Sequence, residues 1–180
     1  NPALEKYAAM VKDPVIDLTL QWSKMVNIDI AEMVHDVPPF PFVRESLERL
    51  TQNADSIVVS QTPIEALIRE WKENEIDHLV NLLAGQEQGT KTEHIALAAK
   101  GKYPDNRILM VGDAPGDYQA ANRNGVLFFP VNPGHEERSW ERFLHEALAK
   151  FFDGTYSGEY EAGLIREFDS YLPEQPHWHV

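Results

Sequence analysis

Two aspartates, four residues apart, follow an apolar segment, and their spacing suggests chemistry. The segment ILMVGDAPGDYQAAN places Asp113 at the end of a predicted strand and Asp117 in the first turn of the helix after it. Two such carboxylates can share a hard cation such as Mg²⁺, which prefers oxygen ligands. They can equally serve the fold, with Asp117 capping the helix and Asp113 accepting hydrogen bonds from the loop. The pair alone leaves both interpretations open.

A hydroxyl group follows a second predicted strand. The β-branched run SIVVS ends at Ser60, and a helix is predicted after it, with Thr62 as its cap and Pro63 in its first turn. A hydroxyl and free backbone N–H groups at a strand-to-helix turn can bind an anion. Taken singly, Ser60 and Thr62 fit an ordinary helix cap better.

A lysine starts a third predicted element. Lys91 lies in GTKTEH, where a cation opposes the helix dipole unless an anionic group holds it, although a lone lysine is usually a solvated surface residue. In chain order, the sequence thus supplies a hydroxyl, a lysine and an acidic pair. Together these groups can donate to an anion, neutralise its charge and bind a metal ion. Phosphoryl transfer needs this combination, because it depends on positioning and electrostatic stabilisation.

The elements that must position these groups alternate between short strands and helices. Strands are predicted at residues 56–60, 78–85, 107–113 and 126–131. Strands separated by helices of this length predict an α/β fold with a parallel sheet. Ligands of such sheets bind beyond the carboxyl ends of the strands, which is where the hydroxyl and the acidic pair fall.

A proline-rich connector divides the chain. Apolar residues recur at helical spacing before it, and Pro38, Pro39 and Pro41 cannot continue a helix. We therefore predict a helical segment, residues 1–37, and an α/β segment, residues 38–180.

An apolar face lies within the first segment. Trp22, Met25 and Met33 recur at helical spacing, and we interpret them as the core of that segment.

The composition restricts the class of function. A net charge of −13 over 180 residues argues against a nucleic-acid or anionic-membrane partner. The absence of cysteine excludes disulfides, thiolate nucleophiles and cysteine zinc sites. Neither an apolar run of about 18 residues nor a signal-peptide pattern is visible, so we expect a cytoplasmic protein without a membrane span. No oligomeric state is favoured.

The motifs together resemble the haloacid-dehalogenase-like hydrolase superfamily, most closely its phosphoglycolate-phosphatase-like branch with a helical cap. The resemblance covers roughly residues 36–135 and rests on PFPFVRESLERL, IVVSQTP, GTKTEHI and ILMVGDAPGDYQAANRNGVLFFPVNPG. It implies a Rossmann-like parallel sheet flanked by helices for the core and a partial helical cap for residues 1–37.

The resemblance also implies a site and an activity. It implies a Mg²⁺-dependent phosphatase that acts on a small phosphorylated substrate through a phospho-aspartate intermediate. Asp113 is expected to hold the metal ion with Asp117 in support, and Lys91 and Ser60 are expected to act in catalysis. The expected phosphate-binding residues are Ser60, Gln61, Thr62 and Lys91.

The resemblance further requires an aspartate nucleophile, in an Asp-x-Asp-Gly-Thr-like motif at the end of the first strand. The segment FFDGTY contains Asp153, but Phe151 occupies the position of the first aspartate. Because a helical pattern precedes it, we predict that Asp153 and Gly154 end a helix and open a turn.

No earlier aspartate supplies the motif either. Asp13, Asp17 and Asp29 lie in helical or pre-helical segments with no strand before them. We therefore expect the first central strand, between the strands that end at Ser60 and Asp113, to be missing from this chain. An N-terminal extension of the natural protein would carry that strand and the nucleophile.

Other classes of function remain open. A non-catalytic relative would keep the fold and bind a phosphorylated metabolite or a protein, and a phosphomutase would use the same groups. A dehalogenase is disfavoured, because its chemistry needs no metal ion and would leave the acidic pair idle.

Overall fold

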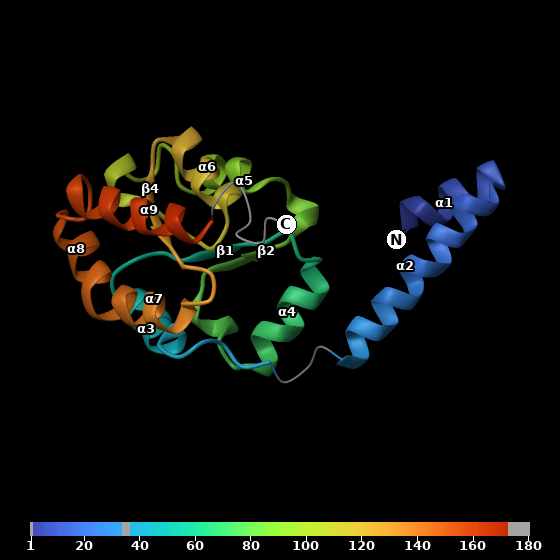
Figure 1. Cartoon of the computed structure of the whole chain (residues 1–180), viewed down its shortest axis with the longest axis horizontal. Coiled ribbons are helices and arrows are strands. Elements are labelled where there is room, and N and C mark those ends of the chain that lie inside the picture. The colour runs from blue at the N-terminus through green and yellow to red at the C-terminus, as the bar shows by residue number, and fades with distance from the viewer. Residues whose placement is uncertain (1, 34–36, 173–180) are drawn as a thin grey trace, which may run out of the picture. The chain divides into compact units, whose positions relative to one another are not determined.

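The computed structural model describes residues 2–33 and 37–172, apart from the side chains of residues 31 and 32. The chain divides into two compact units, Asn1–Val37 and Pro38–Val180. The first unit is coloured blue in Figure 1. Its division from the second unit falls at the start of the proline-rich connector.

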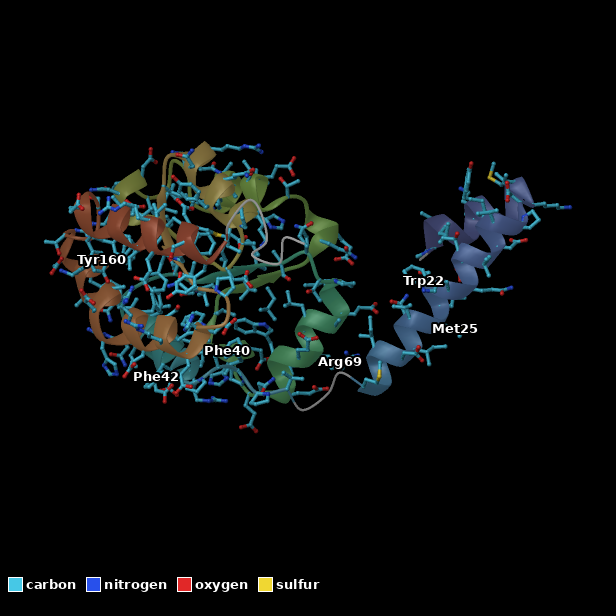
Figure 2. The ribbon with its side chains drawn as sticks, in the orientation of Figure 1. Trp22, Met25, Phe40, Phe42, Arg69 and Tyr160 are labelled. Atoms are coloured by element: carbon cyan, nitrogen blue, oxygen red, sulfur yellow. The ribbon has the colours of Figure 1, made fainter. Side chains whose placement is uncertain are left out.

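The first unit is a pair of helices, α1 (Pro2–Val11) and α2 (Pro14–Met33). Lys24 and Glu5 join them through an ion pair of 2.8 Å. Trp22 and Met25, labelled in Figure 2, are both 63% exposed, and Met33 is 72% exposed. The prediction that these three residues form a core within the first unit is therefore wrong for the described residues, because α2 is twice as long as α1, which does not cover this apolar face.

No helix in the described ranges is both long and apolar enough to cross a membrane.

The second unit contains four short strands, β1 (Ile57–Val59), β2 (Leu82–Ala84), β3 (Leu109–Gly112) and β4 (Leu127–Pro130). β1 pairs with β2 and β3 pairs with β4, both in parallel, so the described residues form two separate two-stranded sheets. All four predicted strands are present. The strand predicted at 78–85 is shorter than expected, because Asp77–Leu79 form a 3₁₀ turn.

β1 and β3 each have one free edge among the described residues. Ser60 donates its N–H to Ala84 across from β1 (2.9 Å), and the Gly112 carbonyl accepts from Val131 across from β3 (2.8 Å). The N–H and C=O groups of successive residues in a strand point to opposite sides. The backbone groups of the residues just before Ser60 and Gly112 therefore point away from the paired strand. Neither β1 nor β3 has a second described neighbour.

Helices account for most of the remaining unit. They are α3 (Val43–Thr51), α4 (Ile64–Glu73), α5 (Lys91–Ala98), α6 (Pro115–Asn124), α7 (Glu136–Arg142), α8 (Leu148–Asp153) and α9 (Glu159–Tyr171). A π-helical stretch, Phe143–Ala147, joins α7 to α8. Further 3₁₀ turns lie at Gln86–Gln88 and Asp105–Arg107.

Helices cover both faces of β3 and β4, as Figure 1 shows. Leu127 and Phe129 of β4 pack against Phe143 and Leu148 in one cluster. The intervening Phe128 packs on the opposite face, in a cluster with residues of α5, α6 and α9. This alternation follows from the period of two in a strand, and it confirms the predicted α/β class.

The outer edge of β4 is closed by side chains. Glu161 of α9 accepts the Phe128 N–H (2.8 Å), and the Tyr156 hydroxyl donates to the Phe128 carbonyl (2.7 Å). Burial raises the pKa of Glu161 above its usual range, although this hydrogen bond opposes the shift. The backbone groups of this edge strand are thus satisfied without another strand.

Asp153 lies at the end of a helix, as predicted. α8 ends at this residue, and Gly154 follows it with a left-handed φ of 83°. Asp153 accepts a hydrogen bond from the Thr155 N–H (2.9 Å) within the turn. It therefore serves the turn and does not follow a strand.

Replacing Phe129 should test the core of the second unit. Phe129 is 1% exposed, and Phe129→Ala should lower the free energy of unfolding by about 3–5 kcal/mol, because it removes packed apolar surface and leaves a cavity. Urea unfolding followed by circular dichroism would measure the change. Phe40→Ala is the control, since Phe40 is 52% exposed, and an equal loss in both variants would contradict the assigned core.

Candidate active site around Lys91 and Asp117

Asp117 is the buried centre of the site. Its side chain is 1% exposed, and one carboxylate oxygen accepts a charged hydrogen bond from the Lys91 ammonium group. The other oxygen accepts the N–H groups of Asp113 and Ala114, both at 3.2 Å. Asp117 therefore caps the start of α6 and holds Lys91 at the same time.

Lys91 is the first residue of α5, where the helix dipole disfavours a cation. The carboxylate of Asp117 removes this difficulty, because it supplies the anionic partner that such a position requires. The start of α5 is fixed by a capping box, in which Thr90 accepts the Glu93 N–H (3.3 Å) and Glu93 accepts the Thr90 N–H (2.8 Å). The Thr90 N–H and the Thr90 hydroxyl both donate to the Glu93 carboxylate (2.8 Å each), and these two bonds lower the pKa of Glu93.

Gly112 makes room for the buried carboxylate. A Cβ atom at this position would overlap the side chain of Asp117. The end of β3 must therefore be a glycine for Asp117 to fold back under the loop and reach Lys91.

Asp113 presents its carboxylate to solvent. The residue is exposed, and within the described part of the chain its carboxylate makes no hydrogen bond or ion pair. Its backbone N–H, by contrast, is held by Asp117 (3.2 Å). The loop thus fixes the backbone of Asp113 and leaves its side chain available to a ligand.

The donor set fits Mg²⁺ only in part. No three Asp, Glu or His side chains gather in a metal-binding arrangement in the described ranges. Mg²⁺ is often bound by one or two carboxylates together with waters and substrate phosphates, and the free carboxylate of Asp113 suits such a site. Asp117 is 1% exposed and already accepts three hydrogen bonds, so it is less accessible to the ion than Asp113.

The loop after β1 is ordered by its own hydroxyl and by a neighbouring turn. Ser60 Oγ accepts the Thr62 N–H (3.1 Å). The prediction that Thr62 caps α4 is wrong, because Glu87 accepts the Ile64 N–H (3.1 Å) in its place. This approach is possible because Gly85 lacks a side chain, since its Cβ would lie 2.8 Å from the Ile64 backbone.

An open pocket of about 340 Å³ lies beside Lys91 and Asp117. It joins three segments, because Gln61 comes from the loop after β1 while the other lining residues come from the starts of α5 and α6 and from the body of α6. The lining residues are Gln61, Thr90, Lys91, Thr92, Ala114, Gly116, Asp117, Gln119, Ala120 and Arg123.

The structure brings only some of the predicted site residues together at this pocket. Lys91 and Asp117 touch, and Gln61 lines the same pocket. The backbone of Asp113 is bonded to Asp117, but the Asp113 side chain is not part of the lining. Ser60 and Thr62 also lie outside the lining, in the adjoining loop.

Sequence reasoning missed the part of the pocket along α6. Gly116, Ala120 and Arg123 recur at helical spacing, so they lie on one side of the helix. It also missed the capping box of Thr90, although the pattern TKTE is a recognisable sequence signal. The helical spacing was visible in the sequence, but nothing there indicated which side of α6 would face α5.

Replacing Asp117 should destabilise the protein, whereas replacing Asp113 should not. Asp117→Ala leaves the Lys91 ammonium and two backbone N–H groups without their acceptor, which should lower the free energy of unfolding by about 3 kcal/mol. Asp113→Ala removes an exposed side chain and should leave stability almost unchanged. Chemical denaturation of both variants would check the ranking, and equal stabilities would refute the buried ion pair as a structural element.

Comparison with known proteins identifies the family. The family model described as haloacid dehalogenase-like hydrolase matches residues 5–131, which include all four strands and the Lys91–Asp117 pair. Searches of curated proteins and of solved structures found no match. Since the family model covers more than half of the 180 residues, the chain belongs to the haloacid dehalogenase-like hydrolase family.

Proposed function

We propose that the protein is a Mg²⁺-dependent phosphatase that hydrolyses a small phosphorylated metabolite through a phospho-aspartate intermediate. Membership in a hydrolase family supports the reaction class. The observation that carries the proposal is the Lys91 ammonium, which buried Asp117 holds beside an open pocket. Asp117 in turn follows the exposed Asp113 by four residues. A preorganised cation at the rim of a pocket is suited to stabilise the charge of a phosphoryl group.

Lys91 is assigned to phosphate binding and charge stabilisation. Because the Lys91 ammonium is already oriented by Asp117, it needs no rearrangement when the phosphoryl group gains negative charge. Gln61 lines the same pocket and can donate its amide to a phosphate oxygen. Ser60 and Thr62 order that loop, and we assign them to the same phosphate-binding segment.

Asp113 is assigned to the metal ion, with Asp117 in support. Mg²⁺ at this position would neutralise negative charge on the phosphoryl oxygens. We assign Asp113 as the direct ligand of the ion, because its carboxylate is exposed and makes no hydrogen bond or ion pair in the described part of the chain. Asp117 supports it through the loop, by holding the backbone N–H of Asp113.

The nucleophile is assigned to a strand between β1 and β3, outside residues 1–180. The edges of β1 and β3 that point away from their partners have no second described neighbour, so each can accept another strand. An aspartate at the end of that strand would lie between Ser60 and Asp113. Its oxygen would attack phosphorus as the ester bond breaks, and water would then cleave the acyl phosphate.

Residues 1–37 are assigned to part of a helical cap. The exposed apolar side chains of α2, among them Trp22 and Met25, suit a surface that packs against other helices or against a substrate. Residues 38–180 are assigned to the catalytic core.

Hydrolysis of p-nitrophenyl phosphate by the product of the complete open reading frame would test the proposed function. Lys91→Ala and Asp113→Ala should each lower kcat by about 10²-fold or more, because each removes charge stabilisation of the phosphoryl group. Chelation of divalent ions should abolish turnover, and added Mg²⁺ should restore it.

Asp169→Ala provides a matched control, because Asp169 is an exposed carboxylate on α9, outside the pocket lining. Its activity should equal that of the unmodified protein. Absence of hydrolysis with every phosphoester tried would instead favour a non-catalytic binding protein. Activity that survives both chelation and Asp113→Ala would contradict the assigned metal site.

A further inference from the structure

The pocket beside Lys91 extends along α6 as far as Arg123. Gly116, Ala120 and Arg123 recur on the same side of this helix, and neither Gly116 nor Ala120 carries more than a methyl group. An added Cβ at Gly116 would meet no heavy atom within 4 Å, so space is open there. The lining thus forms an open track along α6, with Lys91 bonded at the first turn of the helix and Arg123 in its last turn.

The two basic groups differ in their partners. The Lys91 ammonium is bonded to Asp117, whereas the guanidinium of Arg123 makes no hydrogen bond or ion pair with any residue that the structure describes. Among the lining residues, two cations face one carboxylate. The chain as a whole has a net charge of −13, so this excess of positive charge in the pocket lining is local, and it attracts an anion to the pocket.

Side chains that can form hydrogen bonds also belong to the lining. They are Thr90, which caps α5, Thr92 of α5 and Gln119 of α6. Asp117 and Arg123 are six positions apart in one helix, which corresponds to a rise of about 9 Å. Lys91 and Arg123 thus lie beside different turns of α6, which suits a ligand longer than a single phosphate.

We propose that Arg123 binds a second anionic group of the substrate and so determines its specificity. The inference rests on the proposed function, because it assumes that the phosphoryl group lies at Lys91. Arginine presents a fork of N–H donors that matches a carboxylate or a phosphate. The preferred substrate is accordingly a phosphate ester whose far end carries a carboxylate or a second phosphate.

Two phosphonates that resist hydrolysis provide the test. Ethylphosphonate has one anionic group and propane-1,3-diphosphonate has two, and their binding to the full-length protein would be measured by calorimetry at one fixed Mg²⁺ concentration. The unmodified protein should bind the diphosphonate at least 10-fold more tightly. Arg123→Gln should bring the ratio of the two Kd values close to one, and Arg123→Lys should keep part of the preference, because it keeps the charge.

Arg138→Gln is the matched control, since Arg138 is an exposed arginine of α7 outside the pocket lining. It should keep the full preference for the diphosphonate. If the unmodified protein binds ethylphosphonate but shows no preference, or if Arg123→Gln keeps the preference, the inference about Arg123 is wrong while the phosphate site stands. If neither phosphonate binds, the proposed function fails and the inference fails with it.

Discussion

The site depends on one buried ion pair, that of Asp117 with Lys91. A carboxylate that is 1% exposed is costly to bury unless its charge is paired and both of its oxygens accept hydrogen bonds. Asp117 meets this condition with one ammonium group and two backbone N–H groups, which come from two different elements. The start of α5, the end of β3 and the start of α6 are therefore held in one arrangement by one side chain.

Glycine allows this arrangement at two positions. Gly112 leaves space for the carboxylate of Asp117, and Gly85 lets the turn after β2 approach the backbone at the start of α4. The second approach brings Glu87 to the N–H of Ile64 and so orders the loop that carries Gln61. Backbone contacts as close as these explain how segments from three parts of the chain line one pocket.

The four described strands form two separate sheets, and the free edges of these sheets are relevant to the proposed reaction. Glu161 and Tyr156 satisfy the backbone groups on the outer edge of β4. β1 and β3, by contrast, each have one edge without a described partner strand. These open edges suit the pairing of one further strand between β1 and β3. That position is also where the proposed reaction needs its nucleophile, so the fold and the chemistry support the same assignment.

The sequence alone predicted the order of strands and helices, the α/β class and the family, because these depend on local periodicity and short motifs, although each strand ends one residue before its predicted last residue. It also placed Asp153 correctly at the end of a helix. Tertiary packing was needed to show that Asp117 holds Lys91, that Glu87 and not Thr62 caps α4, and that Arg123 lines the pocket. Each of these depends on packing between elements that are far apart in the chain or on which side of a helix faces its neighbour, and local patterns do not encode such choices.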